Sequence, residues 1–141
     1  MSEKHEGACF CGAVRIELLG PPIDMGFCHC RSCREYSGAP VVAFMIWPAA
    51  NVRVTQGADL VSGFNKVGTS DRRFCSRCGA QLMLDHPHLG MVDVRAPIPT
   101  VRFVPKQHLN YGDAVIAMKD GLPKFRDMPA EIGGSGELVA E

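Results

Sequence analysis

The stretch Cys75-Ser76-Arg77-Cys78-Gly79 sets two cysteines three positions apart and ends in glycine. This pattern is typical of a zinc knuckle, in which backbone N–H groups turn toward the sulfurs and glycine tolerates the tight turn. One knuckle supplies half of a tetrahedral site and needs a distant second pair of ligands. Cys9-Phe10-Cys11-Gly12 also ends in glycine and is the obvious partner. We therefore predict a closed, structural zinc site at Cys9, Cys11, Cys75 and Cys78.

The other three cysteines lie close together in Cys28-His29-Cys30-Arg31-Ser32-Cys33. A Cys-x-Cys-x-x-Cys segment can wrap one metal ion with three local ligands and leave the fourth position to water or substrate, as reactive zinc sites do. We predict a second, catalytic zinc at Cys28, Cys30 and Cys33. The alternative is a second closed site, completed by a histidine: His29, His86, His88 or His108.

These clusters contain all seven cysteines of the 141-residue chain. A disulfide framework is not expected in the reducing cytosol, and seven is an odd number. Cysteines that serve only as small buried hydrophobic residues would be scattered along the chain. The division into four and three predicts two Zn²⁺ ions per chain.

The overall charge and hydropathy exclude several classes of partner. Fifteen basic residues balance fifteen acidic ones, so no net field favours nucleic acid or an anionic membrane. The longest apolar run, 41–47, is too short to span a bilayer. Residues 1–7 are polar and lack the apolar stretch of a signal peptide. We expect a cytoplasmic location, and the sequence does not predict the oligomeric state.

Short apolar segments broken by glycine and proline predict an all-β fold of sheets or a partial barrel. Val14, Ile16 and Leu18 alternate with polar residues, the period of a half-buried strand. The predicted strands cover 14–18, 41–46, 52–54, 72–74, 81–84, 91–95 and 101–104. Residues 114–118 could form a strand or a helix. One short helix is predicted over 31–36, closed by Gly38 and Pro40.

The domain organisation expected from the sequence is simple. Residues 1–6 form an N-terminal tail, and residues 7–128 form one zinc-binding domain. Gly133-Gly134-Ser135-Gly136 and the acidic end after it predict a flexible C-terminal tail over 129–141.

Five motifs together resemble the glutathione-dependent formaldehyde-activating enzyme (GFA) family, which includes centromere-protein-V-like proteins. They are, in order, Gly7-Ala-Cys9-Phe-Cys11-Gly12-Ala-Val-Arg15; Cys28-His-Cys30-Arg-Ser-Cys33-Arg34 with Gly38; Phe74-Cys75-Ser-Arg-Cys78-Gly79; Pro105-Lys-Gln-His108; and Asp120-Gly-Leu-Pro123-Lys-Phe125. The resemblance implies the all-β Mss4-like fold. It also implies a structural zinc on the cluster of four cysteines and a catalytic zinc on the cluster of three, the division that the spacing predicts.

The resemblance implies an activity as well, the addition of glutathione to formaldehyde to give S-(hydroxymethyl)glutathione, classed with carbon–sulfur lyases. A free thiol is mostly protonated at neutral pH, and metal binding deprotonates it. The aldehyde oxygen becomes an alkoxide on attack and needs a donor or acid nearby. The candidates for substrate contact are Arg34, Tyr36, Ser37, His108 and Asp120.

The sequence leaves a second class of function open. Both zinc ions could be structural, and the chain would then be a non-enzymatic module that recruits a protein partner. The fourth ligand at Cys28, Cys30 and Cys33 separates the two functions. An open position favours an enzyme that uses a small thiol and an aldehyde, whereas a coordinating side chain favours the module.

Overall fold

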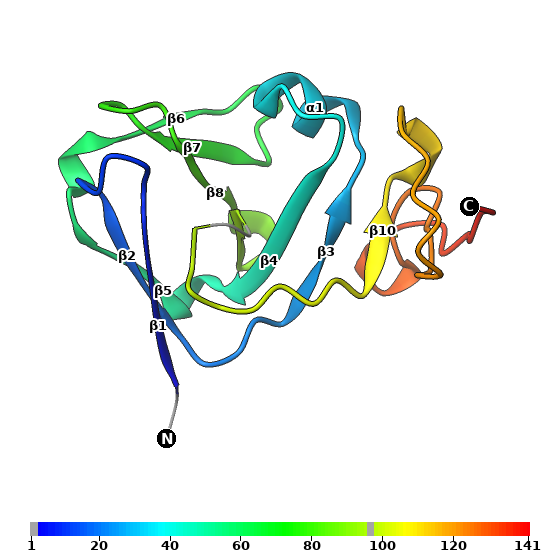
Figure 1. The fold of residues 1–141 in the computed structure, drawn as a ribbon, viewed down its shortest axis with the longest axis horizontal. Helices are drawn as coiled ribbons and strands as arrows, with labels where there is room; N and C mark the ends of the chain where they lie inside the picture. Colours follow the sequence, from blue (N-terminus) through cyan, green and yellow to red (C-terminus); the bar gives the residue numbers. More distant parts are fainter. Residues whose placement is uncertain (1–2, 96–97) are drawn as a thin grey trace. The chain divides into compact units, whose positions relative to one another are not determined.

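The computed structural model describes residues 3–95 and 98–141 and shows a chain built mainly of short strands (Figure 1). Among these residues there are ten strands and one α-helix, which confirms the predicted all-β class. The strands are β1 (Lys4–Ala8), β2 (Arg15–Leu19), β3 (Asp24–Cys28), β4 (Val42–Pro48), β5 (Val52–Gln56), β6 (Val61–Phe64), β7 (Asp71–Cys75), β8 (Gln81–His86), β9 (Met91–Arg95) and β10 (Gln107–Leu109). The helix is α1 (Arg31–Ser37), and short 3-10 turns lie at Ala49–Asn51, Ala58–Leu60, Pro87–Leu89, Tyr111–Asp113 and Ala130–Ile132.

The chain divides into two compact units, of which the first comprises residues 1–24 and 45–103. It contains an antiparallel sheet in the order β1-β2-β5. In β2 the side chains of Ile16 and Leu18 are buried while Arg15 is exposed, because alternate residues of a strand face opposite sides. The predicted alternation is therefore confirmed.

The same unit contains an antiparallel meander in the order β6-β7-β8-β9. Leu82, Leu84 and Val94 on these strands are buried, and Trp47 is fully buried as well. The Trp47 indole donates a hydrogen bond to the Gly20 carbonyl at 2.9 Å, which satisfies its one polar group inside the core. Cys75, the last residue of β7, lies opposite Val61 of β6, so the ladder sets the position of the first knuckle cysteine.

The second unit comprises residues 25–44 and 104–141. Its β3 pairs in parallel with β10, and this pairing places His108 beside Phe27 and Leu109 beside Cys28. A Cβ atom on Gly26 would lie 2.6 Å from the Gln107 carbonyl oxygen, so the close approach of the two strands requires glycine. A strand as short as β10 carries no readable pattern, and the sequence did not predict it.

The predicted helix forms as α1, with its first turn fixed by a cysteine. The Cys30 sulfur accepts a hydrogen bond from the Cys33 N–H at 3.2 Å, which satisfies one of the free N–H groups at the helix start. Gly38 ends the helix with a φ of 72°, a conformation that favours glycine.

In the described residues no α-helix has the length and apolar character that crossing a bilayer requires.

Two predicted segments are not regular elements. Residues 101–104 form no strand, because Pro99 and Pro105 flank them without N–H donors and the Val104 side chain is exposed instead of packed. Residues 114–118 are neither strand nor helix. Val115 and Ile116 lie exposed, and the Met118 N–H donates to the Tyr111 hydroxyl at 3.0 Å instead of to a backbone partner.

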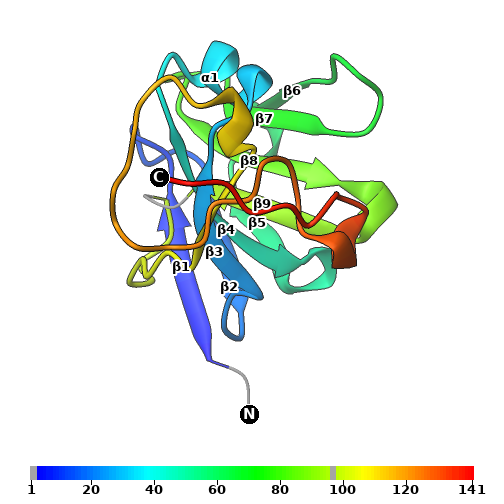
Figure 2. The ribbon, with the colours of Figure 1, turned by 90° about the vertical axis from the view of Figure 1, so that its right-hand side faces the viewer.

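Backbone hydrogen bonding extends past both ends of the predicted domain, residues 7–128. Strand β1 begins at Lys4, before residue 7. Near the other end, Arg126 N–H donates to the Glu137 carbonyl and Val139 N–H to the Lys124 carbonyl, both at 2.8 Å (Figure 2). Segment 129–141, expected to be flexible, thus pairs with 124–126. The division of the chain into two tails, 1–6 and 129–141, and one domain, 7–128, stays a prediction.

Candidate metal centres

The first unit brings together the four cysteines predicted for the closed site. Their sulfurs all lie within 4.8 Å of one another, with Cys9 Sγ 3.6 Å from Cys11 Sγ and Cys11 Sγ 3.9 Å from Cys75 Sγ. A Zn–S bond of about 2.3 Å in a tetrahedron implies an S–S edge of about 3.8 Å. The four-cysteine cluster, Cys9, Cys11, Cys75 and Cys78, therefore has the donor type and spacing that a zinc ion requires.

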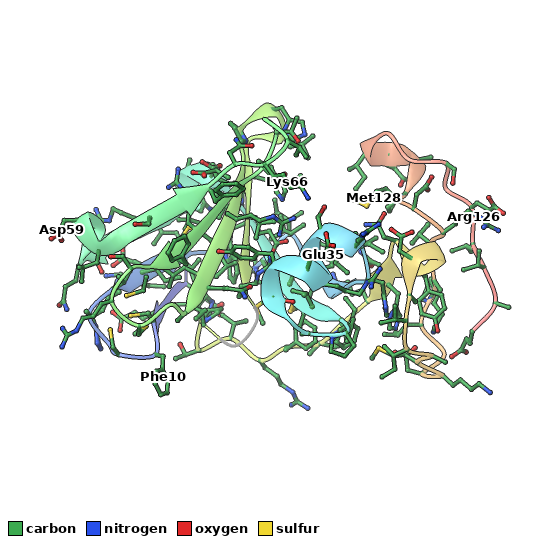
Figure 3. All side chains as sticks on the ribbon, turned by 90° about the horizontal axis from the view of Figure 1, so that it is seen from above. Phe10, Glu35, Asp59, Lys66, Arg126 and Met128 are labelled. Atoms are coloured by element: carbon green, nitrogen blue, oxygen red, sulfur yellow. The ribbon has the colours of Figure 1, made fainter. Side chains whose placement is uncertain are left out.

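Two turns, each ending in glycine, shape this cluster. Gly12 N–H donates to the Cys9 carbonyl at 3.0 Å, and Gly79 N–H donates to the Cys75 carbonyl at 2.7 Å. Both glycines have a φ of 78°, which explains why each cysteine pair is followed by glycine. Phe10, between the first two cysteines, is 92% exposed and points away from the protein (Figure 3), so this turn lies at the surface.

The pKa values within the four-cysteine cluster diverge. Burial opposes ionisation of Cys9, but the Val14 N–H and the neighbouring thiols donate to its sulfur and lower the pKa of Cys9 to about 6. The Ala13 N–H favours the thiolate of Cys11, but desolvation and its thiol neighbours raise the pKa of Cys11 to about 11. Like charges at this distance oppose one another, and a cation is what allows all four sulfurs to be thiolates together.

The second unit brings together Cys28, Cys30 and Cys33, here named the cysteine triad. Cys28 ends β3, Cys30 is the N-cap of α1, and Cys33 lies buried in the first turn of the helix. Their sulfurs lie within 4.8 Å of one another. Hydrogen bonds that the Cys28 thiol donates to Cys30 and Cys33, together with burial, raise the pKa of Cys28 far above its ordinary value. The triad therefore also fits a thiophilic cation such as Zn²⁺.

In the part of the chain that the structure describes, no fourth ligand of the usual kinds joins the triad. Among residues 3–95 and 98–141, no histidine, aspartate, glutamate or further cysteine places a ligand atom within 4.8 Å of all three sulfurs. His29, the nearest candidate along the chain, directs its Nε2 to His108 Nδ1 at 2.8 Å. The described side chains thus supply three ligands to this cluster and four to the other.

Asn110 contacts the triad and was not predicted from the sequence. Its Nδ2 donates to Cys28 Sγ at 3.6 Å and to Met128 Sδ at 3.7 Å. Asn110 has a φ of 55°, a left-handed conformation that asparagine tolerates better than most residues. It follows β10 directly, so only the pairing of β10 with β3 brings it to Cys28.

The five residues predicted for substrate contact fall into two groups. Arg34, Tyr36 and Ser37 lie on α1 with Cys33. The Arg34 Nε donates to the His29 carbonyl at 3.0 Å, and the Ser37 hydroxyl accepts the Ala39 N–H at 3.0 Å at the helix end. The other two residues, His108 and Asp120, are hydrogen-bonded to each other.

His108 and Asp120 belong to a partly buried polar network with His29, Lys124 and Glu141. Asp120 Oδ2 lies 2.7 Å from His108 Nε2, and Asp120 Oδ1 accepts from Lys124 Nζ at 2.8 Å. Lys124 Nζ also donates to Glu141 Oε2 at 3.1 Å. His29, His108 and Lys124 are buried almost completely. The sequence indicated His108 and Asp120. Lys124 stood within the quoted motif but was not a candidate, and Glu141 was missed because the tail over 129–141 was expected to be flexible.

The charges in this network support one another. Partial burial opposes ionisation of Asp120, but hydrogen bonds from Lys124 and His108 outweigh it and hold the pKa of Asp120 well below its usual range. Burial likewise opposes the charge on Lys124, but its bonds to Asp120 and Glu141 raise its pKa. Asp120 is therefore a carboxylate and Lys124 an ammonium ion at neutral pH.

Fold and site together define an all-β protein with two cysteine clusters suited to metal ions. Residues 4–109 match the family described as glutathione-dependent formaldehyde-activating enzyme, GFA, and the chain belongs to this family. The resemblance predicted from the motifs is thereby confirmed.

Individual relatives agree with this assignment. A Halomonas elongata protein, provisionally named a glutathione-dependent formaldehyde-activating enzyme, is 32% identical over 111 residues, which cover 69% of this chain and 71% of that protein. An uncharacterized lyase of Schizosaccharomyces pombe is 27% identical over 79 residues, 56% of each chain. A crystal structure of a Rhodobacter sphaeroides protein matches with a TM-score of 0.55 and 27% identity, over 66% of this chain and 85% of that one.

We expect close to two zinc ions per chain once the protein is fully metallated, because both clusters have sulfur donors at zinc spacing. Elemental analysis after gentle purification and zinc supplementation, followed by removal of free metal, measures this number. Supplementation matters because a three-ligand site releases metal more readily. A reproducible value of one or zero would contradict the division into four and three ligands.

Proposed function

We propose that this chain is a zinc-dependent carbon–sulfur lyase-type enzyme that activates a small thiol such as glutathione for addition to formaldehyde or a related aldehyde. The observation that carries the proposal is the cysteine triad, whose described ligands number three and not four. Membership of the GFA family and the lyase name of one relative support a reaction of this class. The choice of thiol and of aldehyde is part of the proposal.

The proposed reaction needs no oxidant or reductant. The thiol loses its proton, a sulfur–carbon bond forms, and the carbonyl π electrons move to oxygen, which takes up a proton. A zinc ion held by the triad would supply positive charge that favours the thiolate of a bound thiol. Asn110 donates to Cys28 Sγ and so stabilises the negative charge of the ligand set.

The chain's own residues would orient the substrates. Arg34 and Tyr36 lie on the helix that holds Cys33, and we propose them as contacts for the anionic or polar parts of the thiol substrate. Ser37, whose hydroxyl accepts the Ala39 N–H and donates to the Arg34 carbonyl, keeps its candidate role through its second lone pair. The cytoplasmic location and the absence of nucleic-acid and membrane partners stay predictions.

We expect glutathione to bind at the triad metal. Titration of glutathione into cobalt-substituted protein should perturb the sulfur-to-cobalt charge-transfer bands, because a new thiolate ligand changes the coordination of the cobalt. S-methylglutathione, which has no free thiol, is the matched control and should leave the bands unchanged. The Cys30→Ser variant separates the bands of the two clusters, since its spectrum should contain only those of the four-cysteine cluster.

Unchanged spectra at millimolar glutathione would argue against thiol activation and in favour of a module that recruits a protein partner. Turnover of a panel of aldehydes with several thiols, with and without zinc and corrected for the uncatalysed reaction, then tests catalysis itself. A thiol that binds cobalt but supports no turnover with any aldehyde would also contradict the proposal.

A further inference from the structure

Lys124 is a fully buried lysine whose three N–H donors all have acceptors. Its Nζ lies 2.8 Å from Asp120 Oδ1, 3.0 Å from the Leu122 carbonyl oxygen and 3.1 Å from Glu141 Oε2. An ammonium group has three donors and no acceptor, so these contacts use all of its hydrogen-bonding capacity. The lysine therefore has no donor left for a substrate, and any effect on function must come through the groups that it holds in place.

The backbone places Lys124 beside the strand that borders the cysteine triad. His108 and Lys124 form a parallel bridge, in which the Phe125 N–H donates to the His108 carbonyl at 2.9 Å. On its other side β10 pairs with β3, which ends at Cys28 (Figure 1). Lys124 and Cys28 thus lie on segments that flank the same short strand, although they are far apart in the sequence.

A chain of side-chain hydrogen bonds leads from Lys124 to the triad segment. Asp120 joins Lys124 to His108, since its Oδ1 contacts Nζ at 2.8 Å and its Oδ2 contacts His108 Nε2 at 2.7 Å. The other nitrogen of the His108 ring, Nδ1, lies 2.8 Å from His29 Nε2. His29 stands between two cysteines of the triad in the sequence. The chain therefore ends at the segment that carries the ligands.

Tyr111 gives the lysine a second contact with the same two histidines. Lys124 Nζ lies 5.6 Å from the centre of the Tyr111 ring, within the range of a cation–π interaction. The rings of His29 and His108 pack edge-on against this tyrosine, with centroids 4.9 Å and 5.6 Å away. The ammonium group is therefore a common partner of the carboxylate and of the aromatic ring that hold the histidines.

His29 connects the segments that carry the three cysteines. Its N–H donates to the Leu109 carbonyl of β10 at 3.0 Å, and its carbonyl accepts from Arg34 Nε of α1, also at 3.0 Å. Cys28 ends β3, the partner of β10, and Cys33 lies in α1 next to Arg34. A shift of His29 would therefore change how the sulfurs of the triad are directed relative to one another.

We infer that Lys124 is a positioning residue for the cysteine triad, which it fixes through the two buried histidines. Outer-shell groups that orient the ligands of a metal ion contribute to its affinity even though they do not touch it. The inference rests on the proposed function, because it takes the triad to be a metal site. It does not depend on which thiol or aldehyde reacts.

Lys124→Met tests the inference, because methionine fills a similar buried volume but carries no charge and no donor. The Asp120 and Glu141 side chains are 32% and 37% exposed, so without the ammonium group their carboxylates can turn to water. The His108 ring then loses the partner that fixes it. We expect the zinc affinity of the triad to fall by about 10- to 100-fold, the typical effect of losing an outer-shell partner.

Two measurements separate this effect from a general loss of stability. Competition with a zinc chelator gives the affinity of each cluster, and the Cys30→Ser variant shows which affinity belongs to the four-cysteine cluster. Cadmium-113 NMR of cadmium-loaded protein should give one resonance for each cluster. In Lys124→Met we expect the triad resonance to shift or broaden. The other resonance should stay unchanged, because the four-cysteine cluster belongs to the other compact unit.

Arg126→Met is the matched control. It removes a basic residue two positions from Lys124 and breaks an ion pair with Glu137 at 3.0 Å, so it also loosens a contact between segments 124–126 and 129–141. Both side chains of this pair are more than half exposed, and in the described residues the pair has no hydrogen bond to His108. We expect the zinc affinities and the cadmium resonances of the unmodified protein.

Asp120→Ala replaces Lys124→Met if the latter does not fold by circular dichroism. It cuts the link to His108 but leaves Lys124 two acceptors, the Leu122 carbonyl and Glu141. The same selective loss of zinc affinity at the triad is expected, because the inference assigns the effect to the path through His108.

Several results would overturn the inference. One is a triad in folded Lys124→Met that binds zinc as tightly as in the unmodified protein. An equal loss in Arg126→Met would assign the effect to the tail, and a parallel loss at both clusters would indicate general destabilisation. A single cadmium resonance from the unmodified protein would overturn both this inference and the proposed function. Failure of the proposed function alone looks different. Both clusters would then bind metal and Lys124→Met would weaken only the triad, yet the unmodified protein would add no thiol to any aldehyde.

Discussion

Replacement of Cys75 by serine is expected to give insoluble or largely unfolded protein. The Cys75 sulfur is fully buried and lies 3.9 Å from that of Cys11, a residue 64 positions away along the chain. A metal ion in this cluster therefore closes a long loop. Structural zinc sites contribute on the order of 10 kcal/mol of apparent binding free energy. That is comparable to the whole net stability of a domain, about 5–15 kcal/mol.

Serine cannot take over the role of this cysteine. A hydroxyl is a poor ligand for zinc compared with a thiolate, and a buried hydroxyl without a partner costs about 1–3 kcal/mol. Far-UV circular dichroism, thermal melting and zinc content of the soluble fraction measure the effect. A Cys75→Ser variant that melts like the unmodified protein would show that the four-cysteine cluster does not stabilise the fold.

For Cys30→Ser, the expected result is a folded chain with about one zinc ion and no thiol-dependent activity above the uncatalysed rate. The cysteine triad lies within residues 28–33, so a metal ion there constrains only a local segment. Cys30 also caps α1 by accepting the Cys33 N–H, and serine is among the best residues at that position. The substitution removes a metal ligand while it preserves the start of the helix.

The two variants are matched controls for each other, since each exchanges one sulfur for one oxygen. Melting temperature, zinc content and turnover with glutathione and formaldehyde should be measured on both, with the unmodified protein beside them. If Cys30→Ser unfolds the chain while Cys75→Ser stays folded and active, the structural and catalytic roles are the wrong way round. Full activity in a folded Cys30→Ser variant would remove the triad from the reaction.

Local patterns in the sequence predicted a large part of the fold. The alternation over 14–18 led to β2, and the segment after Cys30 led to α1, because hydrophobic period and turn residues act over a few neighbours. The segment 101–104 was wrongly predicted as a strand. Its valines have strand propensity, but two prolines flank them and no neighbouring strand buries them.

By itself, the sequence determined the all-β class, the family and the grouping of the cysteines. Ligand spacing and the glycines after each pair are local properties, and they predicted which sulfurs meet. Tertiary structure alone decided what surrounds the triad. The parallel pairing of β10 with β3 carries His108 and Asn110 to the segment that contains Cys28. The bonds of Lys124 to Asp120 and Glu141 link residues up to 17 positions apart. Such contacts leave no period or spacing in the sequence, because they depend on how distant segments pack.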